Sequence, residues 1–175
     1  IIILVIALVF IIKNFGEKEE EVPLIMYNGF AFYQQADFWH FNWKDTKSED
    51  VFKISLRFNP RDALDVPLEG RIIDGFNDVL KKTSTIYITF DPNATNFTYT
   101  ALAAAELSIS IARALDLTPI AACTINVTDT CKERPIVTCD DRDKAVVYLD
   151  ADIDEAKIQL KDNCLVISGR GLEKL

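Results

Sequence analysis

The sequence predicts an α/β fold of the mixed α+β kind, in which one mixed sheet is packed by two to three helices and preceded by an N-terminal hydrophobic helix. Three observations lead to this prediction: an apolar run at residues 1–12, strand-like alternation in the first and last thirds, and an Ala-rich helical segment at residues 101–117. With 175 residues, 49% of them hydrophobic and 26% charged, the chain has the composition of one folded domain plus a short appendage.

Residues 1–12 are predicted to be a hydrophobic membrane anchor, because they carry no polar side chain. Twelve helical residues span about 18 Å, whereas the hydrocarbon core of a bilayer is about 30 Å thick, so a spanning helix needs further apolar residues before Ile1. No small-residue cleavage site follows, which favours an anchor over a cleaved signal peptide. A buried element of the domain itself is the third interpretation.

An acidic linker is predicted at residues 13–23, where the run from Glu17 to Glu21 contains four glutamates. Such a run stays solvated, so it should hold the following mixed α/β domain, residues 24–175, away from the membrane. The whole chain has a net charge of −8 and a pI near 4.7. Because neutralising phosphates requires clustered Lys and Arg, we expect no nucleic-acid partner.

The first part of the domain is predicted to be made of strands. Residues 24–27 and 30–33 flank Asn28-Gly29, a dipeptide typical of a tight hairpin because both turn positions favour positive φ. An aromatic-rich stretch follows at residues 38–43. Residues 51–58 then alternate between apolar and polar side chains, which predicts a half-buried strand.

The middle of the chain is predicted to form a parallel unit. A helix at residues 71–80 precedes a strand at residues 85–90. The long helix at residues 101–117 and a strand at residues 120–123 come next. Strand, helix and strand in this order predict a crossover connection between two parallel strands, and the small residues of the helix predict close packing on the sheet.

The C-terminal part is predicted to return to strands at residues 135–139 and 145–149, followed by a hairpin of residues 156–160 with 165–168. Residues 169–175 have the pattern of a helix that is just beginning. The whole of residues 24–175 is therefore expected to be one domain.

The four cysteines, Cys123, Cys131, Cys139 and Cys164, predict two disulfides in an oxidising compartment. Zinc is the competing interpretation, but no C-x-x-C pair is present, so we expect no metal and no cofactor. Three pairings of four cysteines remain open. We expect Cys123–Cys131, which closes a short loop, and Cys139–Cys164, which ties neighbouring strands.

Three glycosylation sequons support an extracytoplasmic location: Asn93-Ala94-Thr95, Asn96-Phe97-Thr98 and Asn126-Val127-Thr128. Each triplet is weak by itself, since such triplets occur by chance. Together with the cysteines and the apolar run, they predict a membrane-anchored glycoprotein whose domain folds outside the cytoplasm.

Candidate catalytic groups are few. His40 is the single histidine, and its aromatic neighbours indicate a partly buried strand residue, so no catalytic residue is assigned. Asp91 follows a strand end, where open α/β sheets bind ligands, although an Asp-Pro turn explains it more simply. Residues 150–155 resemble half of a calcium loop but have Glu155 where the loop needs Gly. The aromatics of residues 27–43 are expected either to divide between the core and a partner- or glycan-binding patch, or to be buried as a whole set.

The stretches ITFDPN, ALAAAELSISIARAL, PIAACT, RPIVTCD and DNCLVISG resemble a group of uncharacterised, membrane-anchored archaeal proteins of the cell envelope. The resemblance covers residues 24–170. It implies an N-terminal anchor, paired cysteines in the second half and a further helical segment at the C-terminus, and it implies no activity.

These observations predict a membrane-tethered, non-enzymatic surface domain that acts as a structural or interaction subunit of a cell-envelope assembly. Its expected partners are the membrane, through residues 1–12, and envelope proteins. An envelope enzyme or ligand-binding module that uses the carboxylates near Asp91 is the first alternative. A pilin-like filament subunit is the second, although Lys13 interrupts the apolar run early and Val5 stands where such pilins carry Glu.

Overall fold

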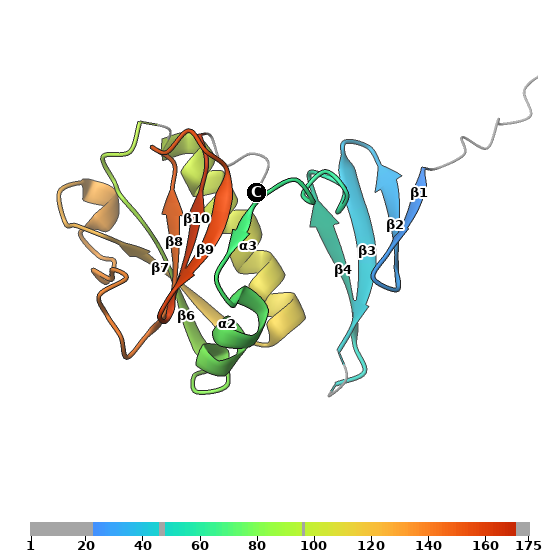
Figure 1. The fold of residues 1–175 in the computed structure, drawn as a ribbon, viewed down its shortest axis with the longest axis horizontal. Helices are drawn as coiled ribbons and strands as arrows, with labels where there is room; N and C mark the ends of the chain where they lie inside the picture. The colour runs from blue at the N-terminus through green and yellow to red at the C-terminus, as the bar shows by residue number, and fades with distance from the viewer. Residues whose placement is uncertain (1–22, 46–47, 96, 171–175) are drawn as a thin grey trace, which may run out of the picture.

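The computed structural model describes residues 23–45, 48–95 and 97–170, which form two β-sheets and two α-helices (Figure 1). The mixed α+β class is therefore confirmed, but the expectation of one sheet is wrong. The strands of the first part pair only among themselves, and the later strands build a second sheet. The predicted N-terminal helix lies outside the described residues.

The first sheet, here called sheet A, is an antiparallel meander of four strands in the order β1-β2-β3-β4. Asn28 and Gly29 have φ values of 47° and 83°, so the hairpin turn predicted from the Asn-Gly dipeptide is present. The strands of sheet A are β1 (Leu24–Tyr27), β2 (Phe30–Gln35), β3 (Phe38–Lys44) and β4 (Val51–Leu56).

One face of sheet A is aromatic. The ring of Phe41 lies 5.4 Å from that of Phe30 and 4.8 Å from that of Phe32, and the rings of Phe30 and Trp43 are 5.7 Å apart. On β4, Ile54 is buried on this same face, as the alternation predicted. These strands bury part of their aromatic residues against one another.

The second sheet, here called sheet B, has six strands in the order β5-β9-β10-β8-β6-β7. Only β9 and β10 pair antiparallel, and the other neighbours run parallel. The predicted parallel pairing of β6 with β7 is confirmed, whereas β5 was not predicted. The strands of sheet B are β5 (Leu68–Glu69), β6 (Thr85–Phe90), β7 (Thr118–Cys123), β8 (Ala145–Asp150), β9 (Lys157–Lys161) and β10 (Cys164–Ser168).

The predicted strand at residues 135–139 is wrong, because this segment makes only a single bridge, from Ile136 to Cys123. Its backbone groups are bonded in other ways. The Thr138 N–H donates to the Asp141 carboxylate at 2.8 Å, and the Val137 carbonyl accepts a hydrogen bond from the Thr89 hydroxyl at 2.7 Å. Side chains thus take some of the hydrogen bonds that a neighbouring strand would have taken, while the Cys123 backbone donates to the Pro135 carbonyl and accepts from the Val137 N–H.

Helices α2 (Ile72–Leu80) and α3 (Phe97–Leu115) pack on one face of sheet B. Ala103, Ala104 and Leu107 of α3 contact the core of the sheet, as the small residues predicted. The helix starts earlier than expected and ends before Asp116, whose φ of 54° turns the chain. The core under the two helices is formed by Ile86, Ile88, Phe90, Val147 and Leu149 together with smaller residues.

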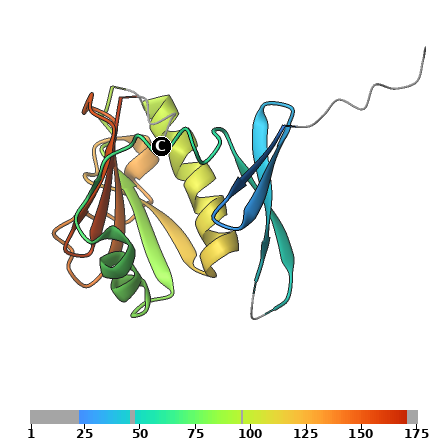
Figure 2. The same cartoon turned by 45° about the vertical axis from the view of Figure 1, so that its right-hand side comes forward.

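Helix α3 also lies between the two sheets, as both views show (Figures 1 and 2). Arg57, just after β4, donates from Nε to Glu106 of α3 at 2.8 Å. Arg113 of α3 donates to the Lys53 carbonyl of β4 at 3.2 Å. Two polar contacts thus join sheet A to α3.

Replacement of Ile88 by Ala should lower the free energy of unfolding by about 2–5 kcal/mol, because Ile88 is 1% exposed in the centre of the core. Ile73 of α2 is 73% exposed, so Ile73→Ala should change the free energy by less than about 0.5 kcal/mol. Urea unfolding followed by circular dichroism measures both. Equal losses in the two variants would contradict the assignment of the core.

Candidate functional site

The carboxyl ends of the parallel strands place several acidic residues at one edge of sheet B. Asp91 follows β6, and Asp150 is the last residue of β8. The Asp91 carboxylate accepts a hydrogen bond from the Asn93 N–H at 2.8 Å, which is the turn that the simpler interpretation of the Asp-Pro pair predicted. Asp152 accepts two hydrogen bonds from Thr95, through its N–H at 3.1 Å and its hydroxyl at 2.9 Å. The loops after β6 and β8 are thus tied together.

The pKa of Tyr148 is raised by burial and by the negative charge at this edge of sheet B. Burial raises the pKa of Tyr148 to about 12, and the negative charges of Asp150, Asp91 and Asp152 add to the effect. The phenol therefore stays protonated over the physiological range. Within the described part of the chain, no group of three or more acidic, histidine or cysteine side chains is arranged to hold a metal ion.

His40 is buried on β3, where its Nδ1 lies 2.9 Å from the hydroxyl oxygen of Ser55. Ser55 is the residue directly opposite on β4, so strand pairing explains the contact. The histidine ring also lies beside the rings of Tyr33 and Phe38. This is the partly buried aromatic setting that the sequence predicted, with the hydrogen-bonding nitrogen satisfied by a cross-strand neighbour.

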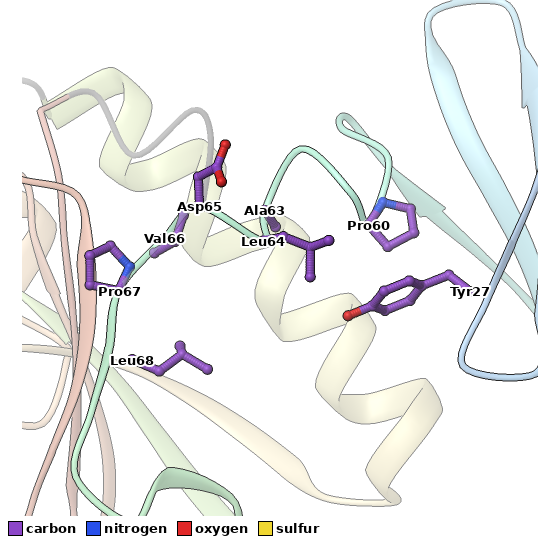
Figure 3. A pocket seen from close by; sticks show the side chains of 8 residues that line it. All are labelled: Tyr27, Pro60, Ala63, Leu64, Asp65, Val66, Pro67 and Leu68. Atoms are coloured by element: carbon purple, nitrogen blue, oxygen red, sulfur yellow. The ribbon is translucent and has the colours of Figure 1, made fainter.

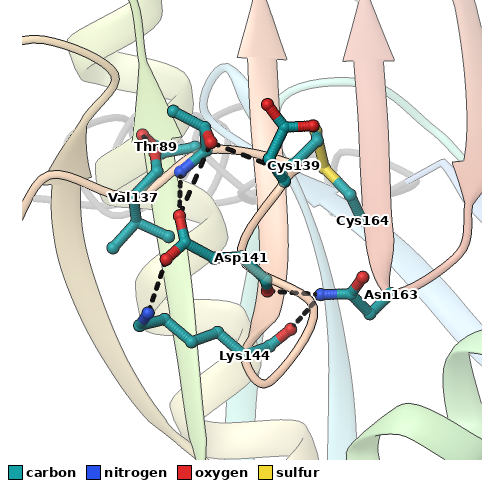
Figure 4. Close-up of a disulfide and its surroundings, with 9 residues drawn as sticks. Thr89, Val137, Cys139, Asp141, Lys144, Asn163 and Cys164 are labelled. Atoms are coloured by element: carbon teal, nitrogen blue, oxygen red, sulfur yellow. Dashed lines mark hydrogen bonds and ion pairs between the residues drawn. A yellow bond between two sulfur atoms is a disulfide. The ribbon is translucent and has the colours of Figure 1, made fainter.

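The structure places the four cysteines in two disulfides with the expected pairing. Cys123–Cys131 joins Cα atoms 5.9 Å apart, and Cys139–Cys164 joins Cα atoms 5.2 Å apart. The first closes the loop after β7 at a short 3₁₀ turn (Asp129–Cys131). The second fastens the segment before β8 to the start of β10 (Figure 4).

A polar network surrounds the Cys139–Cys164 disulfide (Figure 4). Lys144 donates to the Asp141 carboxylate at 2.6 Å, and this contact, together with the Thr138 N–H, holds the pKa of Asp141 below its ordinary value. Asn163 donates from Nδ2 to the carbonyls of Asp141, at 2.8 Å, and of Lys144. These bonds hold the 137–144 segment against sheet B, so the cluster is best explained as structural.

An apolar pocket of about 580 Å³ opens between the two sheets (Figure 3). Tyr27 of β1 lies across it from Pro60 and Leu64. Leu64 and Leu68, on its lining, are 61% and 62% exposed. The pocket is lined by Tyr27, Pro60, Ala63, Leu64, Asp65, Val66, Pro67 and Leu68, and is called the linker groove below.

The sequence did not predict the linker groove, because the residues between Pro60 and Pro67 are charged and apolar in equal number and carry no pattern that indicates a pocket. Two predicted glycosylation sites, Asn93 and Asn126, are exposed, and Asn96 lies outside the described residues. The apolar neighbours of Asn126 are exposed as well, Ile125 by 39% and Val127 by 59%.

No protein-family model, curated protein or solved structure matches this chain. Among the described residues, no helix has the length and apolar character needed to cross a bilayer. The predicted anchor, residues 1–12, and the acidic run of the linker lie outside those residues. The two disulfides indicate an oxidising environment of the extracellular type.

A pH titration tests the strand-end cluster. The difference in tyrosinate absorbance between the unmodified chain and Tyr148→Phe follows the ionisation of Tyr148, and its midpoint should lie near pH 12. Asp150→Asn should lower this midpoint because it removes one negative charge beside the phenol. Asp37→Asn, in the exposed turn between β2 and β3, is the matched control and should leave it unchanged. A midpoint near the ordinary value of 10 would contradict the described burial of Tyr148.

Proposed function

We propose that this chain is a membrane-tethered domain on the extracytoplasmic side, and that it binds another protein of the cell envelope rather than catalysing a reaction. The observation that carries the proposal is the linker groove, an apolar hollow that is open to solvent beside exposed Leu64 and Leu68. Exposed apolar patches beside polar surface are typical of protein interaction sites.

The lining of the linker groove suggests the chemistry of the partner. Tyr27, Leu64 and Val66 offer apolar surface to a side chain of the partner. Asp65 adds a carboxylate to the lining, and the whole chain has a net charge of −8. A partner segment with an apolar anchor and a flanking Lys or Arg would complement this surface.

The position of the groove along the chain fits a tethered binder. Tyr27 is four residues beyond Pro23, the end of the predicted acidic linker. Four extended residues span only about 13 Å. A protein bound in the groove would thus be held close to the point where the domain leaves its tether, as expected for a subunit of an envelope assembly.

A ligand-binding module at the strand ends is the second candidate, favoured by the three carboxylates that act on Tyr148. Substitutions at the two sites distinguish the two candidate functions. Asp91→Asn should weaken a function of the strand ends and leave binding in the linker groove unchanged. Changes at Leu64 should have the opposite effect.

A site-specific photo-crosslinking experiment tests the proposed function in cells that make the full chain. A photoreactive residue in place of Leu64 should give an adduct with one envelope protein, and Leu68→Asp in the same chain should abolish it by placing a charge in the groove. The matched control carries the photoreactive residue at Lys82, which is exposed between α2 and β6.

Adducts at position 82 as abundant as those at position 64, or no adduct at position 64, would contradict the groove as a binding site. Robust hydrolytic turnover by the purified domain that His40→Ala abolishes would contradict the non-enzymatic assignment.

A further inference from the structure

The two sequons that the structure describes differ in whether the threonine hydroxyl is accessible to solvent. Asn93 and Asn126 are both exposed. The Thr95 hydroxyl belongs to an exposed residue and donates one surface hydrogen bond, to Asp152 at 2.9 Å. The Thr128 hydroxyl is buried, and it makes no hydrogen bond to any described residue. One asparagine therefore has an accessible hydroxyl two positions later, and the other does not.

The buried hydroxyl is held in place by the disulfide loop. Asn126 and Thr128 lie between Cys123 and Cys131, and both cysteines are fully buried. The Thr128 carbonyl accepts a hydrogen bond from the Cys131 N–H at 3.0 Å, which closes the short 3₁₀ turn at Asp129–Cys131. In the closed loop, the Thr128 hydroxyl oxygen is therefore shielded from an external partner.

The chemistry of N-glycosylation needs both groups of the sequon. The asparagine side-chain nitrogen attacks the anomeric carbon of a sugar carried on a polyprenyl diphosphate. The new N–C bond forms as the C–O bond to phosphate breaks, the diphosphate leaves with the electron pair, and a carboxylate of the transferase takes the amide proton. The transferase binds the sequon through a hydrogen bond to the hydroxyl two residues after the asparagine. If that hydroxyl is buried, the transferase cannot bind the sequon, even where the asparagine itself is exposed.

We propose that Asn93 is glycosylated on the folded chain, whereas Asn126 is glycosylated only before the Cys123–Cys131 disulfide closes. Glycan transfer to Asn126 and oxidation of this cysteine pair are therefore competing steps, and their relative rates set the fraction of molecules that carry the second glycan. The inference rests only on the extracytoplasmic location in the proposed function, not on the linker groove. A glycan on Asn126 would lie beside the exposed side chains of Ile125 and Val127.

The test uses the full 175-residue chain in detergent, in an Asn96→Gln background so that the neighbouring sequon does not contribute. One sample is folded with both disulfides intact, and the other is reduced and alkylated at its cysteines. Each is incubated with a purified oligosaccharyltransferase and a polyprenyl-diphosphate-linked oligosaccharide. Site-resolved mass spectrometry then measures the occupancy of each asparagine.

The expected result is modification of Asn93 in both samples and of Asn126 only in the alkylated sample. Thr128→Ala should abolish modification of Asn126 and leave that of Asn93 unchanged, and Thr95→Ala should do the reverse. Equal occupancy of Asn126 in the two samples would overturn the proposal. So would failure to modify Asn126 in the alkylated chain, or failure to modify Asn93 in the folded one. Because the components are purified, these outcomes are independent of the cellular location and of the groove.

Discussion

Two disulfides tie residues 124–144, a segment with no strand and only a short 3₁₀ turn, to sheet B. Helices cover one face of the sheet, but parts of this segment cover the other. In the chain-entropy description, loops with separations of 8 and 25 residues contribute about 2.5 and about 3.5 kcal/mol. Since the net stability of a domain is about 5–15 kcal/mol, the two cross-links together amount to a large share of it. The Asp141–Lys144–Asn163 network then fixes the path of the segment between the cysteines.

Sheet A is joined to α3 by polar contacts at the protein surface. Its link to α3 includes the Arg57–Glu106 pair, whose side chains are 40% and 38% exposed, and exposed pairs contribute little to stability. The linker groove spans this junction, with Tyr27 on sheet A and Leu68 on sheet B. A partner that fills the groove would therefore bind both sheets at once and stabilise their relative arrangement by mass action. The proposed binding site thus lies at the junction of the two sheets.

Local signals in the sequence predicted the local structure well. Asn28-Gly29 gave its hairpin because the turn needs two positive φ values, and the β6–α3–β7 unit followed from strand and helix periodicity. The division into two sheets could not be predicted, because it depends on which edge of each strand finds a partner. Residues 135–139 have the pattern of a strand, yet they pair with β7 only around Cys123, and Thr89 and Asp141 bond the Val137 carbonyl and the Thr138 N–H. The linker groove needs Tyr27 and Leu64 to meet in space, and no spacing in the sequence indicates that contact.

The extracytoplasmic assignment depends on the disulfides, so the redox state of the cysteines in the native protein tests it most directly. The full chain is purified under alkylating conditions from the cells that make it, and its intact mass is compared before and after reduction. We expect no alkylation before reduction, four alkylated cysteines after it, and fragments that link Cys123 to Cys131 and Cys139 to Cys164. Four alkylated cysteines in the native, folded protein would contradict both the disulfide framework and the oxidising compartment inferred from it.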